Sequence, residues 1–314
     1  MNIGGYAKIN VLIVTYKQAD VIGRNIESAL TQREYGLNNI VICDDCSPDN
    51  NWDIICSYAK KYPEIVRAYR NEPNLGIYGN SNRVATELRG NADLYLWVEG
   101  DDCICDGYFK ALQEFIQENH IDLNSNFGIL SDWQSIAPDG SIIRNDNNRN
   151  IHLRHTPFSL YLRNLVSWRG SVFSKKVIEQ FENVYTDGGI GLAELLFDSQ
   201  WFRNVTKTYY LPVIGTSYYT QFGISTSLGI DTDWQKEEMV KKWNYLLRNF
   251  TLNWRDRKWA GYRIAKAKYM IKPTLWRFLR ACWLFAIGSY YQNYNSLNKI
   301  IGVLSPFYIR IKRK

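Results

Sequence analysis

The first hundred residues alternate between short apolar runs and segments with helical spacing, and this alternation restricts the possible folds more than any other feature. The apolar runs, which are rich in β-branched residues, and the intervening helical segments lie at 9–14, 20–32, 40–43, 52–62, 66–69, 80–88 and 94–98. Helical segments show apolar residues recurring every three or four positions. Strands that alternate with helices build βαβ units, so we expect an α/β fold around a mostly parallel central sheet flanked by helices.

Polar and acidic residues follow three of these expected strands, and the carboxyl ends of parallel strands share the edge where open α/β sheets bind ligands. The run at 94–98 leads into Glu99, Gly100, Asp101 and Asp102. Carboxylates this close repel one another unless a cation lies between them, and hard oxygen ligands suit Mg²⁺ or Mn²⁺. A solvated acidic turn is the simpler alternative, but the buried strand before it and the two polar loops upstream favour a ligand site.

Four separate motifs carry a resemblance to a known family. They are 13–17, 42–49, 71–76 with Asn82-Arg83, and 99–102. The chain has neither a G-x-G-x-x-G sequence after its first strand nor a Walker A sequence, which disfavours a Rossmann site and a P-loop. In this order the motifs resemble those of glycosyltransferase family 2, inverting enzymes with a GT-A fold, over roughly residues 8 to 228.

The resemblance implies a pocket for the nucleotide of a sugar donor. Thr15 and Tyr16 are expected to line the base pocket, Asp45 to accept a hydrogen bond from the base, and Asp44 to support it from the turn. Arg83 stands where the family often has an arginine near the nucleotide. A structural salt bridge from Arg83 to the Asp44/Asp45 turn is an equally good interpretation.

The resemblance also gives the acidic turn a role, because residues 99–102 stand in the place of the family's D-x-D element. Asp101 is expected to face the ribose, and Asp102 to bind the Mn²⁺ or Mg²⁺ that bridges the diphosphate. Glu99 replaces a commoner Asp, so its part in metal binding stays open.

Glu194 and Asp198 are four residues apart and share one face of an expected helix at 188–201. Inversion needs one base that removes the proton from the acceptor hydroxyl. By resemblance Asp198 matches the family's base better and Glu194 is the reserve, although an acid near a helix N-terminus is also favoured by the helix dipole. The loop at 221–227 resembles one that closes over the diphosphate in the family.

The segment from 127 to 169 is expected to form the acceptor side. Its predicted elements are a strand at 127–133, a hairpin turn at 139–140, a polar loop at 145–150, a strand at 166–173 and a helix at 175–181. Trp168 either stacks on a sugar or belongs to the core.

Charge divides the chain, since residues 231–314 carry 18 Lys and Arg against 5 Asp and Glu, while the remainder carries 20 against 26. We predict helices at 235–250 and 256–271, followed by an apolar, basic segment at 275–287 that is too short to span a bilayer. This composition fits a helix lying in the headgroup region of an anionic membrane. A helical subdomain or an interface between copies is the alternative, and no nucleic-acid motif accompanies the charge.

The sequence therefore predicts a catalytic domain at 1–228 and a basic, aromatic helical extension at 229–314 that associates with membrane or oligomerises. The predicted function is metal-dependent, inverting transfer from a nucleotide-diphospho sugar, UDP-linked by resemblance, to a saccharide acceptor. A lipid-linked acceptor and cell-surface polysaccharide synthesis are expected. With no signal-peptide pattern and no long apolar run, we expect a peripheral protein on the cytosolic face of the plasma membrane. A sugar-phosphate nucleotidyltransferase and a non-catalytic sugar-nucleotide-binding or scaffold protein are the alternatives.

Overall fold

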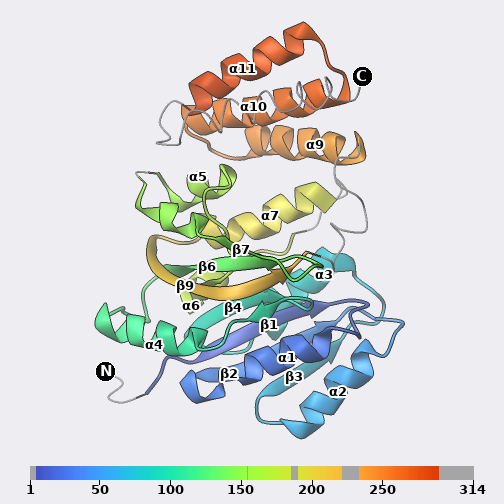
Figure 1. The fold of residues 1–314 in the computed structure, drawn as a ribbon, viewed down its shortest axis with the longest axis vertical. Helices are drawn as coiled ribbons and strands as arrows, with labels where there is room; N and C mark the ends of the chain where they lie inside the picture. Colours follow the sequence, from blue (N-terminus) through green and yellow to red (C-terminus); the bar gives the residue numbers. More distant parts are fainter. Residues whose placement is uncertain (1–4, 154, 185–189, 221–232, 290–314) are drawn as a thin grey trace. The chain divides into compact units, whose positions relative to one another are not determined.

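The computed structural model describes residues 5–153, 155–184, 190–220 and 233–289 (Figure 1). The chain divides into two compact units. The first comprises Met1–Tyr185 with Leu196–Leu228, and the second comprises Thr186–Leu195 with Gly229–Lys314.

One mixed sheet organises the first unit, and within the described residues it contains nine strands. Its order is β3 (Val66–Arg70), β2 (Leu37–Asp44), β1 (Ile9–Thr15), β4 (Leu94–Glu99), β8 (Ser171–Ser174), β6 (Phe127–Ile136), β9 (Lys207–Tyr219) and β5 (Cys103–Ile104), with β7 (Ile142–Asn145) paired to β6. Strands β3, β2, β1 and β4 are mutually parallel, as are β6 and β9, whereas β8 runs antiparallel to β4 and β6. The predicted α/β fold with a mostly parallel central sheet is confirmed.

Helices follow the strands closely in the first unit. Their bounds are α1 (Ile22–Leu30), η1 (Arg33–Tyr35), α2 (Asn51–Lys61), α3 (Gly76–Arg83), the π-helical η2 (Val84–Leu88), α4 (Tyr108–Glu118), η3 (Asn147–His152), α5 (Pro157–Leu162), α6 (Lys175–Ile178) and α7 (Ile190–Arg203), of which α7 lies in this unit only from Leu196 onward. The segments at 20–32, 52–62 and 80–88 are thus helical as predicted, within a few residues.

Both faces of the central strands are buried, which explains why β1 and β4 are apolar at nearly every position. Along β4, Leu96 and Val98 pack with residues of α1, α2 and α4, whereas Tyr95 and Trp97 pack with residues of η2, α5, α6 and α7. Alternate side chains of a strand point to opposite faces. Helices therefore cover the sheet on both sides, and the strand ends are left to form loops.

The predicted strand at 166–173 is only partly correct, because β8 begins at Ser171. The preceding residues turn, with Gly170 at a φ of +65°. The cause lies in the predicted polar loop, which forms η3 and buries Asn148. Asn148 accepts a hydrogen bond from the Ser167 backbone N–H (2.6 Å) and donates to the Arg169 carbonyl (3.2 Å). These side-chain bonds occupy backbone groups that a strand would pair.

Three whole helices, together with the start of α7 as far as Leu195, form the described part of the second unit: α9 (Asp233–Asn249), α10 (Trp254–Ile271) and α11 (Leu275–Ser289). Helix α10 contacts both others, and Trp243, Leu246, Tyr262 and Leu284 are among the buried side chains. Among the described residues, no helix combines the length and the apolar character needed to cross a membrane.

Helix α11 leaves an apolar stripe exposed. Trp276 is 82% exposed and Trp283 is 57% exposed, and Leu275 and Leu279 lie on the same side. Large apolar side chains this exposed are unusual on a soluble surface when they are contiguous.

Candidate metal and ligand site

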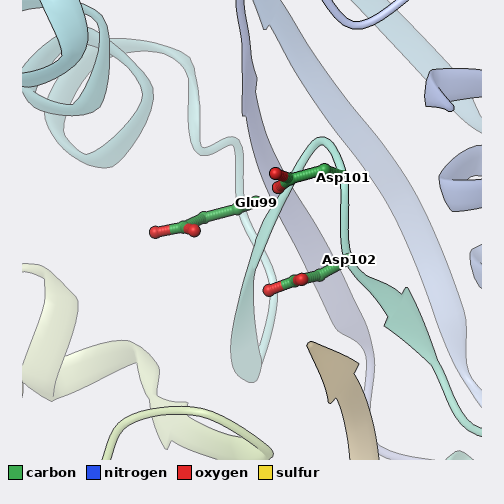
Figure 2. A group of neighbouring side chains, drawn as sticks. All are labelled: Glu99, Asp101 and Asp102. Atoms are coloured by element: carbon green, nitrogen blue, oxygen red, sulfur yellow. The ribbon is translucent and has the colours of Figure 1, made fainter. Parts of the chain in front are cut away.

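The acidic turn after β4 brings three carboxylates together. The ligand atoms of Glu99, Asp101 and Asp102 all lie within 4.8 Å of one another, and Figure 2 shows the three side chains projecting from the turn in the same direction. Helix α1 holds the main chain of this turn. Asn25 donates to the carbonyls of Glu99 and Asp102, both at 2.8 Å, and Arg24 donates to the Asp101 carbonyl at 2.8 Å.

Gly100 allows the acidic turn to approach the loop that follows β1. Its N–H donates to the Val14 carbonyl at 3.1 Å. A Cβ at position 100 would lie 2.3 Å from the Gln18 side-chain oxygen and 2.8 Å from the Thr15 Cβ, distances that real side chains do not tolerate. Glycine is therefore favoured strongly here, and the motifs at 13–17 and 99–102, which are distant in the chain, come together at one edge.

Because these carboxylates are close together and largely buried, their negative charges are unfavourable without a nearby cation. Burial, together with the charge of Glu99, raises the pKa of Asp102 well above its ordinary value, and burial raises the pKa of Asp101. A divalent cation would reverse both effects by favouring the ionised carboxylates. Because all three ligands are hard oxygens, the site fits Mg²⁺ or Mn²⁺ better than a softer metal.

Arg169 is a member of the site that the sequence reasoning did not identify. Its Nη2 lies 3.5 Å from the Glu99 Oε2, and its guanidinium carbon lies 4.7 Å, 4.6 Å and 5.8 Å from the ring centroids of Trp168, Tyr218 and Trp133. Burial lowers the pKa of Arg169, but the neighbouring carboxylates outweigh it, so the net shift is upward. In the sequence, the feature that could have pointed to Arg169 is that it is a charged residue within the apolar stretch at 166–173.

Trp168 belongs to the core, with only 7% of its surface exposed. Of the two interpretations of this residue, the structure supports the core packing. What Trp168 presents to the site is a ring face for Arg169.

Asp44 is fully buried at the end of β2 and holds the following turn together. It accepts hydrogen bonds from the Ser47 backbone N–H (3.0 Å) and the Asn51 amide (2.6 Å), and it pairs with Arg70 at 3.4 Å. Asn51 also reaches Thr15, whose hydroxyl is buried. Asp44 and Thr15 therefore form the inner wall of this edge.

Asp45 is buried at the same edge, with 2% of its surface exposed, whereas Tyr16 lies at the surface. One oxygen of Asp45, Oδ1, accepts from the Asn71 amide (2.7 Å) and the Leu75 N–H (2.9 Å). Among the described residues, none donates a hydrogen bond to its other oxygen, Oδ2. Tyr16 is 43% exposed, so its ring is available at the rim.

Of the two interpretations of Arg83, the salt bridge to the Asp44/Asp45 turn is absent among the described residues, and Arg83 pairs with Glu87 at 3.7 Å. Arg83 donates to the Asn71 side-chain oxygen at 2.6 Å, and Arg70 pairs with Asp44 instead. Asn71 in turn donates to Asp45. Arg83 thus supports the turn indirectly, through one neutral residue.

The two acids of helix α7 have different surroundings. Asp198 is partly buried, and its charge is one of those that raise the pKa of Arg169. Glu194 is exposed and lies 3.5 Å from Lys242 of α9. Asp198 is thus linked electrostatically to the acidic turn, whereas Glu194 pairs with a lysine of its own unit. The predicted closing loop at 221–227 lies outside the described residues.

Comparison with known proteins gives one family. The family model described as Glycosyl transferase family 2 matches residues 10–167, half of the chain. Among solved structures, residues 1–349 of S. aureus TarS in complex with UDP-GlcNAc resemble this chain with a TM-score of 0.54 and 14% identity, covering 91% of this chain and 82% of that one. A likeness at this identity is one of fold, and it confirms the predicted GT-A architecture.

Curated relatives match shorter stretches. The poly(ribitol-phosphate) beta-glucosyltransferase of Bacillus spizizenii is 29% identical over 117 residues, 37% of this chain and 18% of that protein. The UDP-Glc:alpha-D-GlcNAc-diphosphoundecaprenol beta-1,3-glucosyltransferase WfaP of Escherichia coli is 45% identical over 47 residues, 15% of this chain and 18% of that protein. The chain aligns with only 27% of the length of the first curated relatives that it matches.

Proposed function

The chain belongs to glycosyl transferase family 2, and we propose that it transfers a sugar from a nucleotide-diphospho sugar to a saccharide acceptor with inversion at the anomeric carbon. The observation that carries this proposal is the acidic turn. Three buried or half-buried carboxylates converge within 4.8 Å at the carboxyl end of β4, beside the Asp44/Asp45 edge. This is the edge of an α/β sheet where ligands bind.

We propose that the nucleotide binds at the Asp45 edge and is a uridine nucleotide. The second carboxylate oxygen of Asp45 would accept the base N–H, Tyr16 would cover the base, and Asp101 would face the ribose. Asp44, Thr15 and Arg83 would hold this wall in place. The names of WfaP and of the TarS complex, which contain UDP-Glc and UDP-GlcNAc, support uridine.

For the metal we propose Mn²⁺ or Mg²⁺, held by Asp102 with help from Glu99 and Asp101. Bound there, the cation would supply positive charge for the diphosphate as it departs. The chain's own contribution is a buried, preformed carboxylate set whose main chain is fixed by α1.

For the base we propose Asp198, which would take the proton of the acceptor hydroxyl as that hydroxyl attacks the anomeric carbon. Its partial burial and its electrostatic link to Arg169 support this assignment over Glu194, which pairs with Lys242.

A direct assay tests the function. Purified protein is incubated with UDP- and GDP-sugars, with Mn²⁺ or with EDTA, and nucleoside diphosphate release is measured with candidate acceptors. We expect metal-dependent release of UDP that D102N abolishes. Release that survives D102N would refute the metal mechanism, and UDP binding without any release would favour a non-catalytic binding protein.

We further propose that residues 1–228 are the catalytic domain and that 229–314 attach it to the cytosolic face of the plasma membrane, where a lipid-linked acceptor for cell-surface polysaccharide would lie. The exposed stripe of Leu275, Trp276, Leu279 and Trp283, with Arg277 and Arg280 on the same helix, supports this. Apolar and aromatic side chains enter the interface, and each nearby Lys or Arg adds about 1 kcal/mol at an anionic leaflet.

Vesicle flotation tests the attachment. The protein should float with phosphatidylglycerol-containing vesicles, and a W276S/W283S double variant should not. The matched control is W254S, which removes from α10 a tryptophan that is 56% exposed, close to the 57% of Trp283. Self-association that depends on Trp276 and Trp283, without flotation, would favour an oligomer interface.

A further inference from the structure

Arg169 has more hydrogen-bond donors than the protein uses. A guanidinium carries five N–H groups. Among the described residues it makes one hydrogen bond, from Nη2 to Glu99 at a long 3.5 Å, and its buried Nε has no partner. The rings of Trp168, Tyr218 and Trp133 offer their faces to the cation, which favours the charge but satisfies no N–H. The arrangement leaves donors for an anion.

The main chain on either side of Arg169 is fixed. Its N–H donates to the Ser167 hydroxyl at 3.1 Å, and its carbonyl accepts from Asn148 at 3.2 Å. The next carbonyl, of Gly170, accepts from the Tyr108 hydroxyl at 2.7 Å. A donor group positioned in advance loses little freedom when its ligand arrives, which is how sites stabilise charge that develops during a reaction.

Arg169 also lies where the leaving group of the proposed reaction would be. Its Nη2 lies 3.5 Å from Glu99 Oε2, one of the oxygens proposed to help hold the metal. A diphosphate held by a cation at these carboxylates would therefore lie beside the guanidinium, whose N–H groups could donate to its oxygens. The charge of Asp198 is also one of those that raise the pKa of Arg169.

Resting on the proposed function, we infer that Arg169 is a second, built-in cation of the donor site that binds the diphosphate. Without donor it holds Glu99. With donor and metal bound, its N–H groups turn to the diphosphate oxygens and stabilise the charge that accumulates there when the sugar departs. Arginine suits this task because its planar fork matches phosphate oxygens in pairs.

Calorimetric titration of UDP in the presence of Mn²⁺ tests the inference on the full chain. R169Q should bind UDP about 10- to 100-fold more weakly than wild type, the range expected when a charged hydrogen-bonding partner is lost. R169K keeps the charge without the fork and should fall between. The control R149Q removes an arginine from an exposed pair with Asp146 and should bind UDP as wild type does.

Titration of Mn²⁺ alone distinguishes two roles of Arg169. One is direct binding of the diphosphate, and the other is only to hold the carboxylates in place for the metal. R169Q should bind Mn²⁺ as tightly as wild type or more tightly, because a positive charge has been removed beside the metal. If R169Q weakens Mn²⁺ and UDP alike, or leaves UDP affinity within threefold of wild type, the inference is overturned while the proposed function stands. If wild type binds no UDP with Mn²⁺ present, the proposed function fails and the inference with it. Melting curves check that each variant folds, and R169K decides if R169Q does not.

Discussion

Replacing Asp102 by Asn should stabilise the metal-free protein while removing its response to metal. Asp102 is 4% exposed, and burial and the neighbouring carboxylates raise its pKa. Asparagine has nearly the same shape, and its oxygen can still accept the Tyr219 N–H, which lies 3.3 Å from Asp102 Oδ1. The substitution therefore removes a buried charge without opening a cavity or leaving that donor unpaired.

The size of the effect follows from the distances. Two unit charges 4.8 Å apart, the largest separation within the cluster, repel by about 3.5 kcal/mol at an effective dielectric constant of about 20. Arg169 offsets part of this repulsion. We expect D102N to gain about 1–2 kcal/mol, which corresponds to about 3–6 °C in Tm for a folded unit of this size.

The gain should depend on pH with a definite sign. The pKa of Asp102 is higher in the folded than in the unfolded state, so the folded protein binds the extra proton between these two values. Wild type therefore loses stability relative to D102N as pH rises through the folded pKa, and the difference vanishes at acid pH, where Asp102 is protonated in both states. With Mn²⁺ the order reverses, because only wild type gains stability from binding.

Differential scanning fluorimetry from pH 3 to pH 8, with EDTA or with Mn²⁺, measures all of these changes. The exposed Asp106 supplies the control, and D106N should change stability by no more than about 0.5 kcal/mol. A D102N variant that melts below wild type in EDTA at pH 8 would refute the electrostatic reasoning. It would mean that attraction to Arg169 exceeds both burial and repulsion.

Three further predictions concern other parts of the site. D198N should lower sugar transfer at least about 100-fold with UDP affinity unchanged, and E194Q should cost only a few-fold, both measured by initial rates; equal losses would contradict the assignment of the base. G100A places a methyl group 2.8 Å from the Thr15 Cβ and should lower stability by about 1–3 kcal/mol, so an unchanged Tm would contradict the proposed packing. D44A should destabilise the protein by about 3 kcal/mol or more in urea titration, because it leaves several buried donors of its turn unpaired, and a loss under 1 kcal/mol would show that water replaces them.

The sheet edge proposed to bind the sugar donor was predictable from sequence, because the residue patterns that form it are local. Strands β1, β2 and β4 contain apolar runs and end in polar residues, and parallel pairing of β1 with the other two then brings their ends together. Thr15, Asp45 and Asp102 needed only this one inference to be placed at one edge. The GT-A architecture followed from the same pattern together with the family motifs.

Arg169 and β9 were not predictable in this way. The course of the chain at Arg169 depends on the buried amide of Asn148, 21 residues away, which pairs with backbone groups that a strand would use. Strand β9 contains Pro212 and Gly215 and pairs with β6 through a shift of register. Neither feature leaves a periodic pattern, because both rest on partners that are distant in the sequence.

The hydrogen bonds from α1 to the acidic turn affect how such a site can change during evolution. Asn25 and Arg24 hold main-chain oxygens, which every amino acid at positions 99, 101 and 102 supplies equally. Side chains in the turn can therefore be exchanged, and a lineage can drift toward another cation or another charge balance, while the scaffold keeps its shape. The permissive positions are those of the carboxylates, and the constrained ones are Asn25 and Arg24, which hold the main chain. A library aimed at a new metal preference should vary positions 99, 101 and 102 and leave Gly100 and Asn25 unchanged.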